Sequence, residues 1–388
     1  MKYVHRALEA VIERASKQFS AVVLTGPRRA GKTVLLQHLR PSASYRLLED
    51  PAVLAAVRSD PATFLDELKQ PAVIDEIQHA PELLAHIRAR IDAEPRRTGR
   101  WFLTGSQEAP LMQGVTESLA GRAAVLHLLP LSQAESPRVD LWTGGMPEVI
   151  ARPGGRELWF SSYLQTYLER DVRAVTQVKD LATFRRFLAV LASRHGQVLN
   201  KTDLAAPLGV SVPTIGEWLS VLEITGQIAV VPPYFENFGK RLLKSPKVYW
   251  LDSGLVCHLL GLHSRAELER SPFLGPIWEG FVAAEILKTQ TNLGRRRELY
   301  YFRDQQGLEV DFLVPAPNAR LHLVEAKAGR TVTPAMAKPL RSLGEALGDK
   351  LAGASLIPRL KEPPLTRALA PGVILHTLAE LTASIASN

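Results

Sequence analysis

A glycine-rich segment near the amino terminus contains the residue types that hold a chain of phosphates. Residues 26–33 read Gly-Pro-Arg-Arg-Ala-Gly-Lys-Thr and match the pattern G-x-x-x-x-G-K-[ST] in full. The two glycines allow backbone amides to turn toward the phosphates, at the positive end of the helix that follows. Lys32 adds a positive charge, and the Thr33 hydroxyl can bind magnesium. The residues expected to bind ATP are Gly26, Pro27, Arg28, Arg29, Ala30, Gly31, Lys32, Thr33 and Val34.

Two carboxylates some forty residues later supply the second half of such a site. The apolar run Ala72-Val73-Ile74 has the form of a short buried strand, and Asp75 and Glu76 follow it directly. Asp75 is expected to hold Mg²⁺ together with Thr33. Glu76 is expected to polarise the attacking water. The pattern therefore predicts hydrolysis of ATP as well as binding.

Two further groups are candidates for contact with the γ-phosphate. The apolar run Trp101-Phe102-Leu103 ends in the hydroxyl residues Thr104 and Ser106, of which Ser106 is the expected γ-phosphate contact. Ordinary loop polarity would give the same residues. Arg122 precedes another apolar run and is a candidate arginine finger that acts on a neighbouring copy in a homo-oligomer. A surface salt bridge explains Arg122 equally well.

A second group of acids lies near the carboxyl terminus. Asp311 is in the strand-like run 308–314, and Glu325 and Lys327 are in the run 321–327. Glu325 and Lys327 are two residues apart, so both point to one face of a strand. Asp311 and Glu325 are predicted to share a divalent metal, with Lys327 beside the attacking water. This arrangement resembles the PD-(D/E)xK nuclease fold. The resemblance implies one more acidic ligand, for which Glu279 is the candidate and Glu285 the alternative.

Three regions are expected to position these residues. Residues 1–150 alternate strand-like and helical runs, which predicts an α/β domain with a parallel sheet. Residues 155–250 are helical and contain a helix-turn-helix pattern with a possible wing, in which Ser211 is a plausible cap for the second helix. Residues 251–388 are expected to form a nuclease-like α/β domain. The predicted fold class is thus α/β, with a P-loop domain, a winged-helix middle and a restriction-endonuclease-like end.

The distribution of charge makes DNA a candidate partner. The net charge is +8, and residues 233–388 carry 20 basic and 15 acidic residues, a net of +5. The expected phosphate contacts are Lys240, Arg241, Lys244 and Lys247, in the wing. The second helix of the helix-turn-helix, residues 212–222, has no basic residue and contains Glu217, so base-specific reading by this helix is not expected. A solvated surface of a basic protein would explain the same charges.

Composition excludes several classes of protein. Hydrophobic residues make up 46% and charged residues 22% of the 388 positions, which is ordinary for a soluble globular protein. No apolar run reaches the length of about 18 residues needed to cross a bilayer, so no membrane partner is expected. The single cysteine, Cys257, cannot form an internal disulfide, and it follows an apolar run. We therefore expect a cytoplasmic protein with a buried thiol.

Several segments resemble a known family. GPRRAGKT, VIDEIQ, FLTGSQ, SLAGR and GGMPE are similar to motifs of prokaryotic AAA+-type ATPases of the archaeal-ATPase and STAND-like branch. YLERDV, SPKVYWLDSG and EVDF resemble the uncharacterised domain that accompanies this ATPase domain. The resemblance implies ATP and Mg²⁺ as ligands, and implies that Pro147 in Gly145-Met146-Pro147 packs against adenine.

The preferred hypothesis is an ATPase whose nucleotide state alters DNA binding by its carboxyl-terminal half. The alternative is a STAND-like signalling switch that cycles slowly between ADP and ATP states, with a protein-binding or effector domain at its end.

Overall fold

The computed structural model of the chain describes residues 3–105, 117–168, 181–234, 245–360, 362 and 367–387. The backbone divides into two units. The first contains residues 1–131 with the short stretches 224–226 and 291–295, and the second contains the remainder. The first unit thus ends before the expected boundary at 150. Four residues predicted to be functional lie outside the described residues, namely Ser106, Lys240, Arg241 and Lys244.

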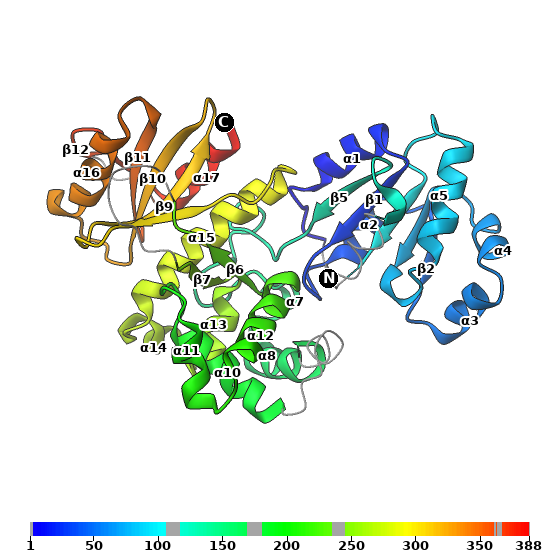
Figure 1. Ribbon diagram of the computed structural model, residues 1–388, viewed down its shortest axis with the longest axis horizontal. Helices are drawn as coiled ribbons and strands as arrows, with labels where there is room; N and C mark the ends of the chain where they lie inside the picture. The colour runs from blue at the N-terminus through cyan, green and yellow to red at the C-terminus, as the bar shows by residue number, and fades with distance from the viewer. Residues whose placement is uncertain are drawn as a thin grey trace. The chain divides into compact units, whose positions relative to one another are not determined.

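The first unit is built on a parallel sheet with the strand order β2-β3-β4-β1-β5 (Figure 1). The strands are β1 (Ala21–Thr25), β2 (Ser44–Leu47), β3 (Ala72–Asp75), β4 (Trp101–Thr104) and β5 (Ala123–His127). The phosphate-binding segment follows β1, and the paired acids come at the end of β3. Because β4 lies between β1 and β3, its carboxyl end brings Thr104 between the two halves of the predicted site.

Helices cover both faces of this sheet. Ala21 and Val23 of β1 belong to one core cluster, which includes residues of α3 (Pro51–Ser59), α4 (Pro61–Asp66) and α5 (Leu83–Ala93). Val22 and Leu24 belong to a second cluster, with α1 (Glu9–Gln18) and α2 (Lys32–Leu39). Successive side chains of a strand point to opposite faces, so an apolar run such as 21–24 is buried on both sides. The expectation of a parallel α/β domain is confirmed.

The first half of the second unit is mostly helical. Its helices are α7 (Pro147–Ala151), α8 (Arg156–Tyr163), α10 (Leu181–Ser193), α11 (Lys201–Ala205), α12 (Val212–Ile224), α13 (Ser253–Leu259) and α14 (Arg265–Arg270). The strands β6 (Ile228–Val231) and β7 (Lys247–Trp250) pair in an antiparallel manner. The Ser211 hydroxyl accepts the Thr214 N–H at 3.2 Å, so Ser211 does cap α12. The elements therefore follow the predicted order of helix, turn, helix and two strands.

The second half of this unit contains a six-stranded sheet. It begins with α15 (Leu274–Asn292) and continues through β8 (Tyr300–Arg303), β9 (Glu309–Ala316), β10 (Arg320–Lys327), α16 (Lys338–Leu347) and β11 (Leu351–Pro358). It ends with β12 (Ala368–Ala370), β13 (Val373–Leu375) and α17 (Leu378–Ser387), and the strand order is β12-β13-β11-β10-β9-β8. A core cluster forms between the sheet and α16.

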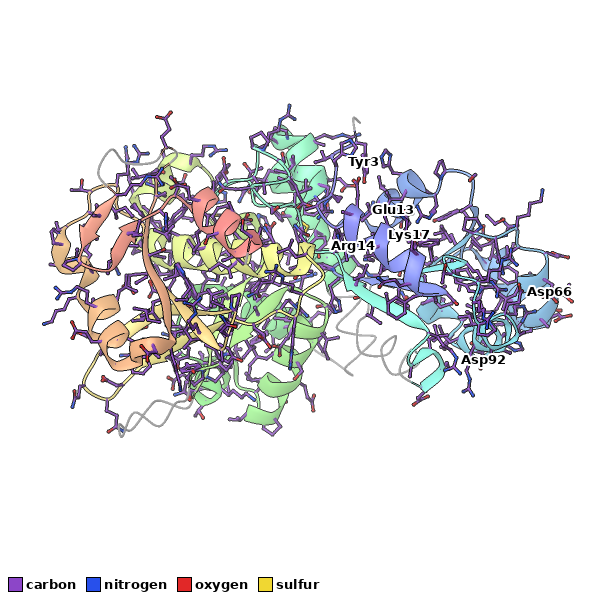
Figure 2. All side chains as sticks on the ribbon, turned by 90° about the horizontal axis from the view of Figure 1, so that it is seen from above. Tyr3, Glu13, Arg14, Lys17, Asp66 and Asp92 are labelled. Carbon is purple, nitrogen blue, oxygen red and sulfur yellow. The ribbon has the colours of Figure 1, made fainter. Side chains whose placement is uncertain are left out.

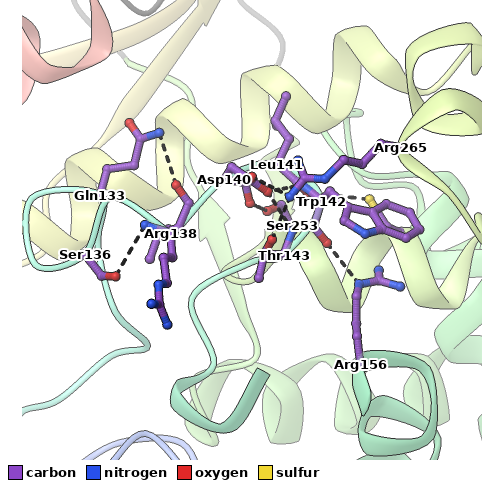
Figure 3. Close-up of polar contacts among 12 residues, drawn as sticks. Gln133, Ser136, Arg138, Asp140, Leu141, Trp142, Thr143, Arg156, Ser253 and Arg265 are labelled. Atoms are coloured by element: carbon purple, nitrogen blue, oxygen red, sulfur yellow. Dashed lines mark hydrogen bonds and ion pairs between the residues drawn. The ribbon is translucent and has the colours of Figure 1, made fainter. Parts of the chain in front are cut away.

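Asp252 fixes the loop that contains the Gly-Gly-Met-Pro segment. Its carboxylate accepts the Gly145 N–H at 2.7 Å and the Leu255 N–H at 2.9 Å, so it joins the loop to the start of α13. Neighbouring contacts hold the same loop, among them the ion pair of Asp140 with Arg265 at 2.8 Å (Figure 3). Gly144 has a φ of +71°, and a Cβ there would lie 2.2 Å from Asp252 Oδ1. The local packing therefore requires glycine at 144.

The thiol of Cys257 is buried, as expected. Burial raises the pKa of Cys257 to about 12, so it is not a nucleophile at neutral pH. Among the described helices, none combines the length and apolarity of a membrane span.

We expect Gly144→Ala to destabilise the protein more than Gly209→Ala does. Gly209 has a similar φ of +66°, but a Cβ there would meet nothing within 4 Å. Both substitutions force alanine into the left-handed region, at about 1–2 kcal/mol. Only Gly144→Ala also displaces a buried carboxylate, which adds about 1–3 kcal/mol. Urea unfolding measures the difference, and equal losses of stability in the two variants would contradict the role given to Asp252.

Candidate nucleotide site and acidic centre

The phosphate-binding loop depends on backbone conformations that glycine adopts readily. Gly26 has a φ of +137°, and a Cβ there would lie 2.2 Å from the carbonyl oxygen of Leu128. Gly31 has a φ of +99° directly before α2. The loop brings the Lys32 ammonium back over its own backbone, where Nζ donates to the carbonyls of Gly26 at 2.9 Å and Pro27 at 3.0 Å. The cation therefore lies within the curve of the loop, at the amino end of α2.

Arg6 also supports this loop, and the sequence analysis did not predict this role. Its side chain is buried, and it donates to the carbonyls of Ala30 at 2.8 Å and Leu129 at 2.7 Å. These bonds join the loop to the chain just after β5. No motif marks Arg6, because an arginine ahead of an amphipathic helix is common on any protein surface.

Asp75 is the meeting point of the predicted magnesium site. Its Oδ2 accepts the Thr33 hydroxyl at 2.7 Å and the Tyr45 hydroxyl at 2.7 Å, and its Oδ1 accepts the Thr104 hydroxyl. Burial, together with the neighbouring Asp75 carboxylate, raises the pKa of Tyr45, so the phenol stays a donor. Carboxylate and hydroxyl oxygens at this spacing are ligands that suit Mg²⁺, so the residues fit the metal that the motif implies.

Glu76 has a backbone conformation that is rare for a residue with a side chain. Its φ is 59° and its ψ is 50°, in the left-handed region. This conformation turns its N–H toward the Thr104 hydroxyl, at 3.1 Å, and its carboxylate accepts the Gln78 amide. Such strain costs about 1–3 kcal/mol and is common at functional sites. Thr104 thus holds both acids. Contact of Ser106 with the γ-phosphate stays a prediction.

The remaining residues of the loop differ in their surroundings. Arg28 is buried, with its guanidinium 3.8 Å from Glu49. Arg29 is exposed, with a φ of 63°. Val34, on the first turn of α2, is 56% exposed.

Arg122 lies at the edge of the sheet opposite the phosphate-binding loop. It precedes β5, and its backbone carbonyl accepts the N–H of Ala21 at the start of β1. Its guanidinium pairs with Asp92 of α5 (labelled in Figure 2), with distances of 2.5 and 3.0 Å. The structure therefore contains the salt bridge considered as the alternative. Action of Arg122 on a neighbouring subunit stays a prediction.

Pro147 is the first residue of α7 and belongs to the second unit. The Gly145 N–H that precedes it is bound to Asp252. Contact of Pro147 with adenine stays a prediction.

The acids near the carboxyl terminus come together on neighbouring strands. Asp311 on β9 lies beside Glu325 on β10, and Glu325 Oε2 accepts the Asp311 N–H at 3.4 Å. Asp311 Oδ2 accepts the Ala326 N–H at 2.9 Å, and Lys327 Nζ contacts Glu325 Oε1 at 2.5 Å. Burial, then the negative charges of Glu279 and Glu325, raise the pKa of Asp311 well above its usual value. Burial also raises the pKa of Glu325. A divalent cation would relieve this repulsion.

Glu279 enters the same centre from α15, where Lys247 and Tyr249 of β7 hold it. Lys247 Nζ lies 3.0 Å from Glu279 and 2.7 Å from Glu309, and the Tyr249 hydroxyl donates to Glu279 at 2.5 Å. Lys247 was expected on the surface as a DNA contact, but it is only 3% exposed, and two carboxylates engage its ammonium. It pairs with these two half-buried acids instead.

Glu285, the alternative to Glu279, faces other partners. Its carboxylate binds Lys288 at 2.9 Å and the Gln133 N–H at 2.8 Å.

Removal of the Thr104 hydroxyl should separate ATP turnover from ATP binding. In Thr104→Val the two acids lose a shared partner, and a misplacement of 1 Å can cost about 100-fold in rate. We expect turnover to fall at least about tenfold, while ATP affinity stays within about threefold because the loop is untouched. A coupled hydrolysis assay and a titration measure the two. Thr63→Val, on the exposed side of α4, is the control. Full turnover in Thr104→Val, with a loss in Ser106→Ala, would contradict this assignment.

Comparisons with known proteins agree with the geometry of the first unit. Residues 18–136 match the family described as an AAA domain, and residues 137–266 and 274–371 match two domains of unknown function, DUF8612 and DUF4143. Two uncharacterized proteins, Rv2008c of Mycobacterium tuberculosis and Mb2031c of Mycobacterium bovis, are each 35% identical over 344 residues, which cover 87% of this chain and 76% of theirs.

Two solved structures are similar to the chain at lower sequence identity. The Walker-type ATPase PABY2304 of Pyrococcus abyssi is 16% identical with a TM-score of 0.39, over 65% of this chain and 94% of that one. A variant of RuvB of Thermotoga maritima is 19% identical with a TM-score of 0.29, over 58% and 86%. Because the mycobacterial relatives are 35% identical over most of both chains, the chain belongs to the family of Rv2008c and Mb2031c, and its own residues 18–136 match the AAA domain.

Proposed function

We propose that the first unit hydrolyses ATP in a reaction that requires magnesium. The observation that carries this proposal is the position of Asp75, whose carboxylate accepts hydroxyl groups from both Thr33 and Thr104. Thr33 lies in the first turn of α2, and Thr104 ends β4, the strand that pairs with β3. This arrangement suits a bound nucleoside triphosphate, since a carboxylate and a hydroxyl side by side are the usual protein ligands of its magnesium ion.

The side chains divide the work of hydrolysis among them. Lys32 and the backbone amides of the loop bind the β- and γ-phosphates. Thr33 and Asp75 would hold Mg²⁺, which neutralises charge that develops on the phosphate oxygens. Glu76 orients the attacking water and accepts its proton. In support of this role, the strained backbone of Glu76 donates its N–H to Thr104, whose hydroxyl also contacts Asp75.

A second candidate function, metal-dependent cleavage of DNA, is supported by the acidic centre of the second unit. Asp311 and Glu325 are adjacent and buried, Lys327 lies on the face of Glu325, and Glu279 is near enough to raise the pKa of Asp311. Hydrolysis of a phosphodiester bond needs a metal-bound water and a cation near the leaving oxygen. The acids can hold the metal, and Lys327 can supply the cation. Nucleotide state at the first unit would then regulate DNA binding by the second.

The rival proposal is a slow nucleotide switch in which the second unit binds a protein. The two proposals predict different effects of DNA on the rate of ATP hydrolysis. A DNA-dependent ATPase hydrolyses ATP faster when DNA is added. A nucleotide switch purifies with tightly bound ADP, and DNA does not change its rate of hydrolysis. Comparison of hydrolysis with and without single-stranded, duplex and branched DNA separates them.

Two substitutions should affect ATP binding and ATP hydrolysis separately. Glu76→Gln keeps the shape of the side chain but removes the proton acceptor, so we expect turnover to fall at least about 100-fold with binding retained. Lys32→Ala removes the main cation, so binding itself should be lost. The controls are Glu82→Gln and Lys17→Ala, exposed on α5's preceding turn and on α1. Turnover at the normal rate in Glu76→Gln would show that another group accepts the proton.

Nicking of supercoiled plasmid DNA tests the acidic centre. With Mg²⁺ or Mn²⁺ we expect the wild-type chain to nick, and Asp311→Asn and Lys327→Met to lose at least about 100-fold of the rate, with ATP binding unchanged. Burial raises the pKa of the Asp311 carboxyl, so its ionised form is unfavourable in the folded protein at neutral pH. Asp311→Asn removes this ionisable group and should therefore be at least as stable as the wild type at neutral pH.

The controls for this assay are Asp349→Asn and Lys350→Met, both exposed in the same unit. If the wild-type chain fails to nick any form of DNA with either metal, the catalytic proposal for this centre is wrong.

A further inference from the structure

Two histidines and a glutamate meet on the first unit, away from the Asp75 junction. His5 precedes α1, Glu9 opens α1, and His38 lies in the last turn of α2. One ligand atom from each lies within 4.8 Å of the other two. No other set of three histidine, cysteine or acidic side chains among the described residues meets this criterion. Two imidazoles and a carboxylate are a frequent protein ligand set for zinc.

Hydrogen bonds from outside the group orient the glutamate. Glu9 Oε1 accepts the Tyr3 hydroxyl at 2.8 Å and the Arg6 N–H at 2.7 Å. Its other oxygen, Oε2, lies 3.4 Å from His5 Nδ1. Burial alone would raise the pKa of Glu9, but the bonds from Arg6, Tyr3 and His5 hold it below its usual value. One carboxylate oxygen thus faces the His5 imidazole.

Ring contacts fix the imidazoles in a similar way. The Tyr3 ring (Tyr3 is labelled in Figure 2) stacks on His38, with centroids 3.8 Å apart and 20° between the planes. His5 stands edge-on to His38 at 5.7 Å. His5 is also 81% exposed on its side chain, so a metal ion and its water can reach it from solvent. Tyr3 therefore supports two of the three side chains, as neighbours of metal ligands commonly do.

We propose that His5, Glu9 and His38 bind a divalent cation of the zinc class, with water in the fourth position. Nitrogen ligands favour Zn²⁺, Co²⁺ or Ni²⁺ over Mg²⁺, so this site differs in chemistry from the one at Asp75. The metal would tie the segment that contains Arg6 to α2. Arg6 holds the loop carbonyl of Ala30, and α2 begins at Lys32. A bound metal would therefore restrain the segment that contains Arg6 against the helix that follows the phosphate-binding loop.

Titration of the untagged, metal-free full-length chain with Co²⁺ tests the site. We expect the wild type to bind one equivalent of Co²⁺ and to show the intense visible absorption of four-coordinate cobalt. Zn²⁺ should abolish this absorption, and millimolar Mg²⁺ should not. His38→Ala should bind at least about tenfold more weakly and lose this absorption. His263→Ala removes another exposed imidazole, on the second unit, and should match the wild type.

Two results would overturn the proposal: no such absorption in the wild type, or equal affinity and stoichiometry in the wild type and His38→Ala. Thermal unfolding of the metal-free proteins checks that His38→Ala is folded. Tyr3→Phe keeps the stacked ring but removes the bond to Glu9, so it should weaken cobalt binding by a smaller factor than His38→Ala does.

Discussion

The Asp75 carboxylate is the interaction on which the organisation of the first unit depends. Three separate parts of the chain donate a hydroxyl to it: Thr33 from α2, Thr104 from β4 and Tyr45 from β2. A buried carboxylate is stable only when such donors satisfy it. The strand order places β4 between β1 and β3, so the junction exists only when all these strands are in register. The contacts of Asp75 therefore form only in the correctly assembled sheet.

The loop around Lys32 depends on backbone contacts of its own. Gly26 has to pass close to Leu128 after β5, and Arg6 has to reach the carbonyls on both sides of this contact. These are backbone constraints, which a side-chain motif does not express. They explain how a loop that curves around a cation can be rigid before any phosphate arrives, and a rigid loop loses less entropy on binding.

Buried charge organises the second unit as well, through a different balance. Glu279, Asp311, Glu325 and Glu309 are drawn from three elements, and Lys247 and Lys327 offset them. Burial on its own lowers the pKa of Lys247, but the carboxylates of Glu279, Asp311 and Glu309 raise it above its usual value overall. Lys247 comes from β7, so it also fastens the two-stranded sheet to α15 and β9. Removal of either lysine from this cluster would leave the surrounding carboxylates uncompensated, which is costly.

Sequence reasoning succeeded where a local pattern has a single physical meaning. The apolar runs 72–74 and 101–103, each followed by polar residues, gave β3 and β4 in nearly their observed positions. The pairing of Asp311 with Glu325 was also foreseen. It failed where meaning depends on tertiary contacts. Lys247 has the appearance of a surface cation in the sequence, and only the packing of β7 against α15 shows that it is buried.

Support for the site was equally hidden. Arg6 and Tyr45 carry no motif, because their partners are distant in the chain. The strand β2, with its partly exposed residues, has too little apolar periodicity to be recognised without the neighbouring β3.

The most direct test of this account is the magnesium dependence of ATP hydrolysis in Asp75→Asn. The amide keeps the size of the side chain and loses its charge, so ATP affinity measured without metal should match the wild type. The magnesium concentration that gives half-maximal turnover should rise at least about tenfold, since a carboxylate ligand is lost. The same half-maximal concentration and the same rate in both proteins would contradict the assignment of Asp75 as the centre of the site.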